Sequence, residues 1–203
     1  MIAIQAHSFS TRLPGKIYRE IKGKSLLEWC VESCREITNQ VVVVGTLGDR
    51  DLAEFCAHHN IAHHAAAVDD QDVLGRYASL LRTYRPPWVC RVTSDCPYIS
   101  VPQLAYAVAT HLKGFDFTSN IFPPRHTPDG DDVEVMSARL LEHLDQRVNQ
   151  MEYREHVCSW VYDHTETLSK DFRICKITQM LDFSHVKTSI DTEEDLKRVE
   201  AML

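Results

Sequence analysis

At 203 residues the chain has the length of one α/β domain with a substantial core, and no apolar run in it approaches the length of a membrane span. Its formal net charge of −7 argues against general nucleic-acid binding, which requires a basic surface, although a local basic pocket for a nucleotide remains compatible with an acidic exterior. The N-terminus lacks a basic-then-apolar secretion pattern, and the seven cysteines, an odd number scattered through apolar segments, indicate free thiols in a reducing compartment. We therefore expect a cytoplasmic protein without membrane or nucleic-acid partners.

Strands and helices alternate through the first half of the chain. Apolar residues at helical spacing predict helices at about 25–37, 49–60 and 73–84, and Ser25 and Asp49 can cap the first two. Short apolar runs predict buried strands at residues 1–6, 40–45, 61–66 and 88–93. Because strand and helix alternate three times, this half predicts right-handed βαβ units on a parallel sheet.

The second half is less regular. Residues 120–130 contain three prolines and are expected to form a loop over the ligand site. The remaining patterns predict helices at about 101–112, 137–148, 153–164 and 191–203, and strands at 115–119, 132–136 and 172–177.

The first strand runs into a loop, residues 7–16, that combines hydroxyl groups, two cations and a Pro-Gly turn. A buried strand that leads into such a loop places Arg12 and Lys16 outside the carboxyl edge of the sheet, where ligands bind in open α/β sheets. Arginine offers a forked donor set for phosphate oxygens, and lysine a movable point charge. The loop therefore predicts a site for a polyanion, most simply a nucleoside triphosphate. The alternative is an ordinary solvated turn.

Two aspartates are candidates for a metal site. Asp95 comes just after the predicted strand 88–93, so it lies at the same edge of the sheet as the first loop, and a hard carboxylate oxygen there fits Mg²⁺. A turn-capping aspartate before Pro97 is the alternative. By composition alone, Asp191 is a helix N-cap, and either it or Thr192 caps the last predicted helix.

Several blocks of the sequence resemble the cytidylyltransferases that activate acidic sugars. These include the CMP-Kdo and CMP-acylneuraminate synthetases and, closest of all, the SpsF-like branch of polysaccharide biosynthesis. The blocks occur in the family's order over nearly the whole chain, which makes them far more specific together than singly. They are Gln5-Ala6 with 10–16, and then 72–77, 91–97, 128–135, 154–157 and 191–196.

The resemblance implies a Rossmann-like three-layer α/β nucleotidyltransferase, similar to the GT-A fold, with a central, mostly parallel sheet. It implies a single domain, 1–203, in which residues 120–165 are a candidate lobe for acceptor binding or dimerisation. The implied reaction transfers CMP from CTP to an acidic sugar, or to a related phosphate or phosphonate acceptor, and releases pyrophosphate during surface polysaccharide or related biosynthesis. The implied partners are CTP, a small anionic acceptor and a second copy of the chain.

The resemblance also implies roles for single residues. Asp95 and Asp191 would hold Mg²⁺, and Arg12 and Lys16 would stabilise the charge on the departing pyrophosphate. The nucleotide site would comprise Arg12 and Lys16 with Ala6, His7, Ser10, Thr11, Gly15, Arg76 and Ser94. By their chemistry and their place in or near these blocks, the acceptor candidates are Asp129, Asp132, Glu134, Arg154, His156 and His185.

The sequence departs from the family's pattern at the first loop. His7 stands where an arginine is usual, which removes a permanent cation, and Phe9 stands where glycine or alanine is usual. Thr188 occupies the slot of the branch's usual tryptophan. Two alternative functions therefore remain: a glycosyltransferase that uses a ready-made nucleotide sugar, and a homologue that binds nucleotide with impaired catalysis.

Overall fold

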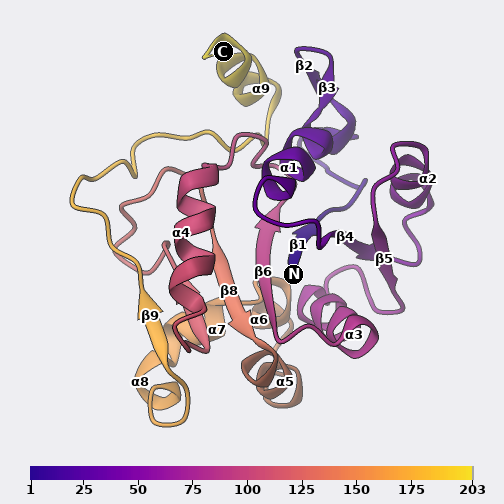
Figure 1. Cartoon of the computed structure of the whole chain (residues 1–203). Coiled ribbons are helices and arrows are strands. Elements are labelled where there is room, and N and C mark those ends of the chain that lie inside the picture. The colour runs from indigo at the N-terminus through magenta and orange to yellow at the C-terminus, as the bar shows by residue number, and fades with distance from the viewer. Residues whose placement is uncertain (203) are drawn as a thin grey trace.

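The computed structural model describes residues 1–202, and its centre is a seven-stranded mixed sheet (Figure 1). The strand order is β5-β4-β1-β6-β8-β7-β9, in which β4, β1 and β6 run parallel and β8 is antiparallel to both of its neighbours. The strands are β1 (Ile2–Gln5), β4 (Val41–Thr46), β5 (His63–Ala66), β6 (Trp88–Thr93), β7 (Phe117–Ser119), β8 (Glu134–Ser137) and β9 (Ile174–Lys176). The expected α/β fold with a mostly parallel central sheet is confirmed.

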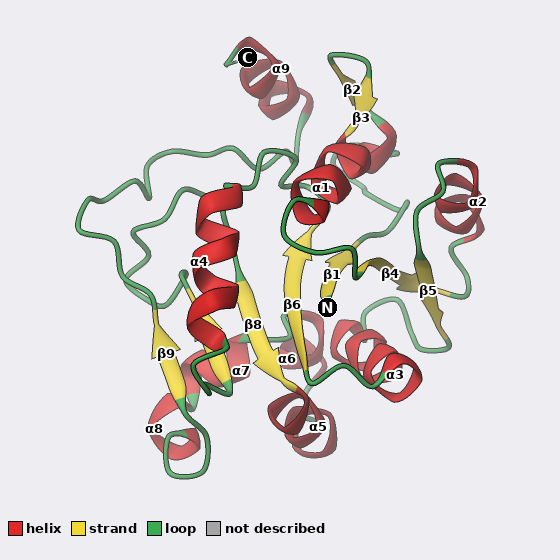
Figure 2. Ribbon diagram, in the orientation of Figure 1, coloured by secondary structure: helices red, strands yellow, loops and turns green. Residues whose placement is uncertain are grey.

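Helices cover both faces of the sheet and make three layers (Figure 2). Because alternate residues of a strand point to opposite faces, Ile2 and Ile4 pack in one core cluster and Ala3 in the other. The first cluster includes α1 (Leu26–Arg35), α2 (Arg50–His58) and α4 (Val101–His111). The second includes α3 (Val73–Tyr84), α5 (Ala138–Arg147), α7 (Ser159–Asp163) and α8 (Thr165–Leu168).

The helices begin where short polar side chains can satisfy their first N–H groups. Ser25 forms a reciprocal capping box with Glu28, and Asp49 accepts a hydrogen bond from the backbone N–H of Leu52. Asp72 caps α3 in the same way, by accepting from the backbone N–H of Gly75 at 2.9 Å. The caps expected at Ser25 and Asp49 are therefore present.

One expectation of local structure is wrong, and two short elements were not expected. The single helix expected over 153–164 is divided between α6 (Met151–Glu155) and α7, and Val157 between them has a left-handed φ of 30° that a continuous helix does not allow. A short 3₁₀ turn (Lys16–Tyr18) and the hairpin of β2 (Glu20–Ile21) and β3 (Lys24–Ser25) were not expected.

Part of the segment 120–165 belongs to the central sheet. It contains β8, which pairs with β6 and β7 within the central sheet. Its expected role in acceptor binding or dimerisation stays a prediction.

The C-terminal segment returns to the carboxyl edge of the sheet. After β9 a long loop crosses the molecule, and the chain ends in α9 (Glu193–Ala201), which lies near α1 (Figure 2). The backbone N–H of Ile190 donates to the carbonyl of Asp95 at 2.9 Å, and Ile190 itself packs with Leu13 and Leu26 in a small third cluster. This contact fixes the start of the last segment, including Asp191, beside the end of β6. Within residues 1–202, no helix has both the length and the apolar composition that a membrane crossing requires.

Candidate active site

Asp49 holds the start of the loop that follows β1. Asp49 is 1% exposed and accepts hydrogen bonds from the backbone N–H of Ser8 at 2.7 Å and from its hydroxyl at 2.6 Å. The Ser8 hydroxyl also lies 2.5 Å from the hydroxyl of Tyr18. Asp49 was expected only as a helix cap. Its second role joins residues far apart in sequence, so no local pattern could have indicated it.

The second half of the loop turns Lys16 inward. Gly15 has a φ of +61°, which glycine adopts at little cost, and the Lys16 N–H donates to the carbonyl of Leu13 at 3.0 Å. The hydroxyl of Ser10 accepts from the backbone N–H of Leu13 at 3.3 Å and so supports the turn. Lys16 is 9% exposed, whereas the neighbouring Thr11 is exposed.

Lys16 lies between two carboxylates. Its Nζ is 3.0 Å from Asp95 Oδ2 and 3.2 Å from Asp191 Oδ1, and Asp191 Oδ1 also accepts from the guanidinium of Arg12 at 2.9 Å. Lys187 pairs with the other oxygen of Asp191 at 3.3 Å. The structure thus brings together the four residues expected to be catalytic: Arg12, Lys16, Asp95 and Asp191.

The charges of this cluster are closely coupled. Burial alone would raise the pKa of Asp95, but the ammonium of Lys16 and nearby hydrogen bonds hold it below its usual value. Burial lowers the pKa of Lys187, but its hydrogen bonds to Asp195 and Asp191 outweigh this and raise it. The Asp95 carboxylate is therefore charged at neutral pH and is balanced by a cation of the protein.

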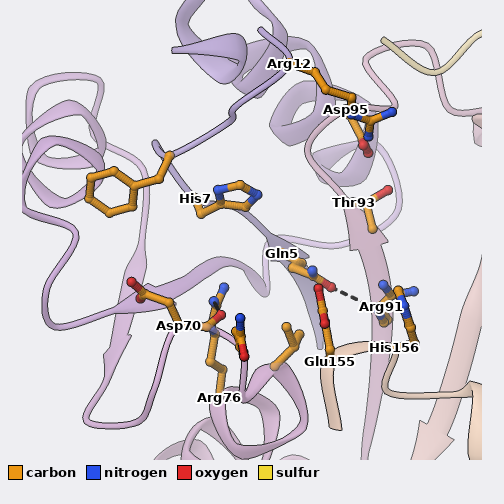
Figure 3. A pocket seen from close by; sticks show the side chains of 13 residues that line it. Gln5, His7, Arg12, Asp70, Arg76, Arg91, Thr93, Asp95, Glu155 and His156 are labelled. Atoms are coloured by element: carbon orange, nitrogen blue, oxygen red, sulfur yellow. Dashed lines mark hydrogen bonds between the residues drawn. The ribbon is translucent and has the colours of Figure 1, made fainter. Parts of the chain in front are cut away.

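A cavity of about 460 Å³ opens beside this cluster, at the carboxyl ends of β1 and β6 (Figure 3). Arg12 and Asp95 lie at one end of the cavity. Arg76, near the start of α3, and Asp70, in the turn before α3, lie at the opposite end. The expected site residues that line the cavity are His7, Arg12, Arg76, Asp95 and His156.

Arg76 is a buried cation with unused hydrogen-bond donors. The residue is 2% exposed, and its Nη2 donates to the carbonyl of Asp70. Nε and Nη1 have no partner among residues 1–202 although both are buried, and burial lowers the pKa of the guanidinium. Buried donors are seldom left unpaired in proteins, so these two nitrogens indicate a place for acceptor atoms of a ligand.

His7 provides a neutral ring at the same cavity. Burial of the imidazole and the nearby charges of Arg76 and Lys16 lower its pKa below 6.5. The ring is therefore uncharged at neutral pH in the free protein, unlike the arginine that is usual at this position in the family.

Ala6 and Ser94 lie at strand ends below the cavity and do not line it. The N–H of Ala6 donates to the carbonyl of Val44 at 3.2 Å, and that of Ser94 to the carbonyl of Gln5 at 3.0 Å. Both residues are buried and complete the sheet. The geometry therefore offers no support for direct contact of these two with a nucleotide.

Two acceptor candidates, Glu134 and Arg154, are used inside the protein. Glu134 is 2% exposed and receives hydrogen bonds from Arg91 and Tyr162. Arg154 donates from Nε to Asp72 Oδ1 at 2.7 Å and from Nη2 to Asp145 Oδ1 at 2.9 Å. Neither lines the cavity, because these pairs hold β8 against β6 and α6 against α3, so a direct acceptor role for them is not supported.

The other acceptor candidates are dispersed. Asp132 pairs with Arg125, and Asp129 lies 4.0 Å from the same guanidinium, away from the cavity. Burial raises the pKa of Asp132 to about 6, although Arg125 opposes this shift. His185 is exposed on the loop between β9 and α9. Only His156, which is exposed at the rim, joins the cavity.

The structure adds cavity residues that were not singled out from the sequence. Gln5, Arg91, Thr93 and Glu155 all line it. Gln5, Arg91 and Thr93 belong to the central strands, and Arg91 and Thr93 alternate along β6 with the core residues Cys90 and Val92. That alternation of polar and apolar residues is visible in the sequence and could have indicated that Arg91 and Thr93 face a site.

Comparison with known proteins agrees with this geometry. A family model described as "Cytidylyltransferase" matches residues 1–202. The spore coat polysaccharide biosynthesis protein SpsF of Bacillus subtilis is 26% identical over 212 aligned positions, covering all of this chain and 85% of SpsF. A cytidylyltransferase structure from Leptospira borgpetersenii aligns with a TM-score of 0.89 and 29% identity, over 98% of this chain and 84% of the other.

A more distant structure shares the fold. CMP:2-keto-3-deoxy-manno-octonic acid synthetase, solved in complex with CTP, aligns with a TM-score of 0.73 at 14% identity, over 99% of this chain and 96% of the other. Taken with the full-length family match and with the convergence of the first loop, Asp95 and Asp191 around Lys16 beside one cavity, the comparisons confirm the resemblance. The chain belongs to the cytidylyltransferase family, whose members are nucleotidyltransferases.

Proposed function

We propose that this protein transfers CMP from CTP to an acidic sugar, or to a related phosphate or phosphonate acceptor, and releases pyrophosphate. Membership of the cytidylyltransferase family supports the nucleotide and the reaction class, and similarity to a polysaccharide biosynthesis protein supports a sugar-derived acceptor. The observation that carries the proposal is the position of Lys16, whose Nζ contacts Asp191 and also Asp95, a residue that lines the cavity. A triphosphate bound there would meet a cation and two carboxylates at once.

The nucleoside part of CTP would lie at the Arg76 end of the cavity. The unpartnered Nε and Nη1 of Arg76 would donate to acceptor atoms of the base or of a phosphate. His7 lies beside it as a neutral ring that can donate or accept a hydrogen bond. The ordering of Arg76 before the ligand arrives would reduce the entropy lost on binding.

The phosphates would lie against the loop 7–16. Arg12 and Lys16 would exchange their carboxylate partners for oxygens of the β- and γ-phosphates and would stabilise the charge that develops as pyrophosphate leaves. Because Asp49 anchors the start of this loop, its backbone N–H groups are preorganised.

The two carboxylates fit a divalent cation such as Mg²⁺. Asp95 and Asp191 already share one cation, the Lys16 ammonium, and hard carboxylate oxygens with phosphate and water oxygens are the ligands that Mg²⁺ prefers. When bound, the metal would neutralise phosphate charge and polarise the reacting oxygens. The role of Lys16 would then be to withdraw from the carboxylates towards the phosphates.

Pyrophosphate release tests this proposal. Wild-type protein is incubated with Mg²⁺, each of the four ribonucleoside triphosphates in turn, and a panel of sugar acids and phosphorylated compounds. We expect release with CTP and an acidic acceptor. Asp95→Asn should abolish it, whereas Asp51→Asn on the exposed surface of α2 should not change it. Near wild-type turnover by Asp95→Asn would refute its catalytic assignment.

The same assay separates the alternatives. A glycosyltransferase would release no pyrophosphate under these conditions. An impaired homologue would bind CTP in calorimetry but would not turn it over.

A further inference from the structure

Arg91 is a charged residue on β6, in the middle of the sheet. Along this strand Cys90 and Val92 point into the first core cluster, whereas Arg91 and Thr93 line the cavity on the other face. Only 15% of the Arg91 side chain is exposed. A guanidinium at this depth needs hydrogen-bond partners, and the partners of Arg91 within residues 1–202 use only two of its three nitrogens.

The partners of Arg91 hold its guanidinium in one orientation. Nη1 donates to a carboxylate oxygen of Glu134, which lies directly opposite Arg91 in the register of β6 and β8. Nε donates to the side-chain oxygen of Gln5 at 3.1 Å. The other oxygen of Glu134 accepts from the hydroxyl of Tyr162, which lies 2.9 Å from the hydroxyl of Ser119.

The third nitrogen of Arg91 remains available. Within residues 1–202, Nη2 has no hydrogen-bond partner, and it is not among the nitrogens that are buried without one. Arg91 lines the cavity, so a ligand there can reach this nitrogen, and Figure 3 shows the guanidinium bonded to Gln5. The network on the opposite edge fixes its direction, as a preorganised binding group requires.

The cavity has an end that the proposed nucleotide does not use. Arg76 and His7 mark the nucleoside end, and Arg12 and Asp95 mark the phosphate end. Arg91 lies two residues deeper along β6 than Thr93, about 7 Å at the usual rise of a strand, and the C-terminal end of α6 contributes Glu155 and His156 to the same cavity.

We infer that Arg91 binds an anionic group, carboxylate or phosphate, of the acceptor, and that Glu134 is the positioning residue that holds it. The inference rests on the proposed function, because it takes the acceptor end to be the part of the cavity that CTP leaves free. Guanidinium groups bind both kinds of anion through charge-assisted N–H donors, and Nη2 is the nitrogen of Arg91 that can supply them. The carboxylate of Glu155 at the rim fits hydroxyl groups, so the acceptor class is a polyhydroxylated acid.

The test compares variants that retain a balanced interior. Arg91→Gln alone would leave the buried carboxylate of Glu134 unpaired and could unfold the protein. The double variant R91Q/E134Q removes both charges together, and Arg91→Lys retains the cation without its fork. The matched control is K24Q/E32Q, which removes an exposed ion pair of 2.6 Å on another part of the protein.

Two measurements are made on each protein. The first is the KM for the best acceptor of the panel and the KM for CTP, from pyrophosphate release. The second is calorimetric titration of inorganic phosphate into protein saturated with CTP and Mg²⁺. The CTP phosphates then occupy Arg12 and Lys16, and the measurement does not depend on turnover. We expect R91Q/E134Q to raise the acceptor KM and the phosphate Kd at least tenfold, with the CTP KM changed less than twofold. Arg91→Lys should fall between, and the control should match wild type.

The results distinguish failure of this inference from failure of the proposed function. Pyrophosphate release with an unchanged acceptor KM and phosphate Kd in R91Q/E134Q would overturn the assignment of Arg91 and leave the proposed function standing. A rise in the CTP KM alone would also overturn it, because Arg91 would then serve the nucleotide. Loss of phosphate binding in the double variant would support the anion site even if no panel compound released pyrophosphate, in which case only the proposed reaction would fail.

Discussion

Lys16 Nζ lies 3.0 Å from Asp95 Oδ2, and the same nitrogen lies 3.2 Å from Asp191 Oδ1. One side chain from the first loop thus balances two carboxylates that come from the middle and the end of the chain. If these carboxylates hold a metal, Lys16 competes with it as long as no phosphate draws the ammonium away. Metal and nucleotide should therefore bind cooperatively, each favouring the other.

The first prediction concerns this competition. Lys16→Met should tighten Mn²⁺ binding to the nucleotide-free protein about tenfold, equal to about 1.4 kcal/mol, because the carboxylates lose their internal counter-ion. In wild-type protein, CTP should tighten Mn²⁺ binding instead. Electron paramagnetic resonance of free Mn²⁺ measures both, and Lys24→Met is the control for a lost surface lysine. Equal Mn²⁺ affinity in Lys16→Met and wild type would show that the Lys16 ammonium does not compete with the metal for the two carboxylates.

The second prediction concerns Arg76, which has opposite effects on stability and binding. Its buried Nε and Nη1 lack partners within the described part of the chain, residues 1–202, and each unpaired buried donor costs about 1–3 kcal/mol. Arg76→Leu should therefore raise the melting temperature of the ligand-free protein and weaken CTP binding at least tenfold. Thermal unfolding and calorimetry measure the two effects.

Arg82 on the same helix is the matched control for Arg76. Its side chain is 65% exposed and pairs with Asp145 at 3.1 Å. Arg82→Leu should leave CTP affinity unchanged and should not raise the melting temperature. A less stable Arg76→Leu protein with normal CTP affinity would mean that Arg76 serves the fold and not the ligand.

Local chemistry allowed much of this fold to be predicted. Ser25 and Asp49 cap helices through contacts within three residues, so the capping pattern alone located two helix starts. The valine run 41–44 could only be a buried strand in a parallel sheet. The meeting of Asp95 and Asp191 at Lys16 is different, because by composition Asp191 was only a helix cap, and the expectation that the two act together came from family resemblance.

Features that depend on distant partners could not be predicted. Glu134 was expected to contact the acceptor, but the register of β6 and β8 places it opposite Arg91, and no sequence pattern sets that register. Arg154 was expected to bind the acceptor because of its charge, but its guanidinium donates instead to Asp72 and Asp145. The helix break at Val157 has no glycine or proline to indicate it.

The third prediction concerns His7, the main departure from the family's first loop. Its ring is neutral at pH 7 because burial and nearby cations lower its pKa. His7→Arg should restore a permanent cation at the cavity and tighten CTP binding by about 1.5–3 kcal/mol, as expected for a charge-assisted hydrogen bond. Calorimetry at pH 7 measures this change, and His58→Arg on the exposed end of α2 is the control. Weaker CTP binding by His7→Arg would show that the cavity is built around the imidazole.

The fourth prediction concerns the acid sensitivity of the fold. His111 is 4% exposed at the end of α4, and burial lowers its pKa from 6.5 to about 4. In the unfolded chain His111 therefore binds a proton below about pH 6.5, whereas in the folded state it does so only below about pH 4. The free energy of unfolding therefore falls as the pH drops through this window. At pH 5 the loss is about 2 kcal/mol.

Replacing His111 isolates its share of this acid sensitivity. The free energy of unfolding in urea should fall between pH 7 and pH 5 by about 2 kcal/mol less in His111→Gln than in wild type. The pKa values of His7, His63 and His64 are also lowered by burial, but these groups act equally in both proteins and cancel in the comparison. If both proteins lost the same stability, His111 would already be protonated in the folded state, and its burial beside Thr118 would have to open in mild acid.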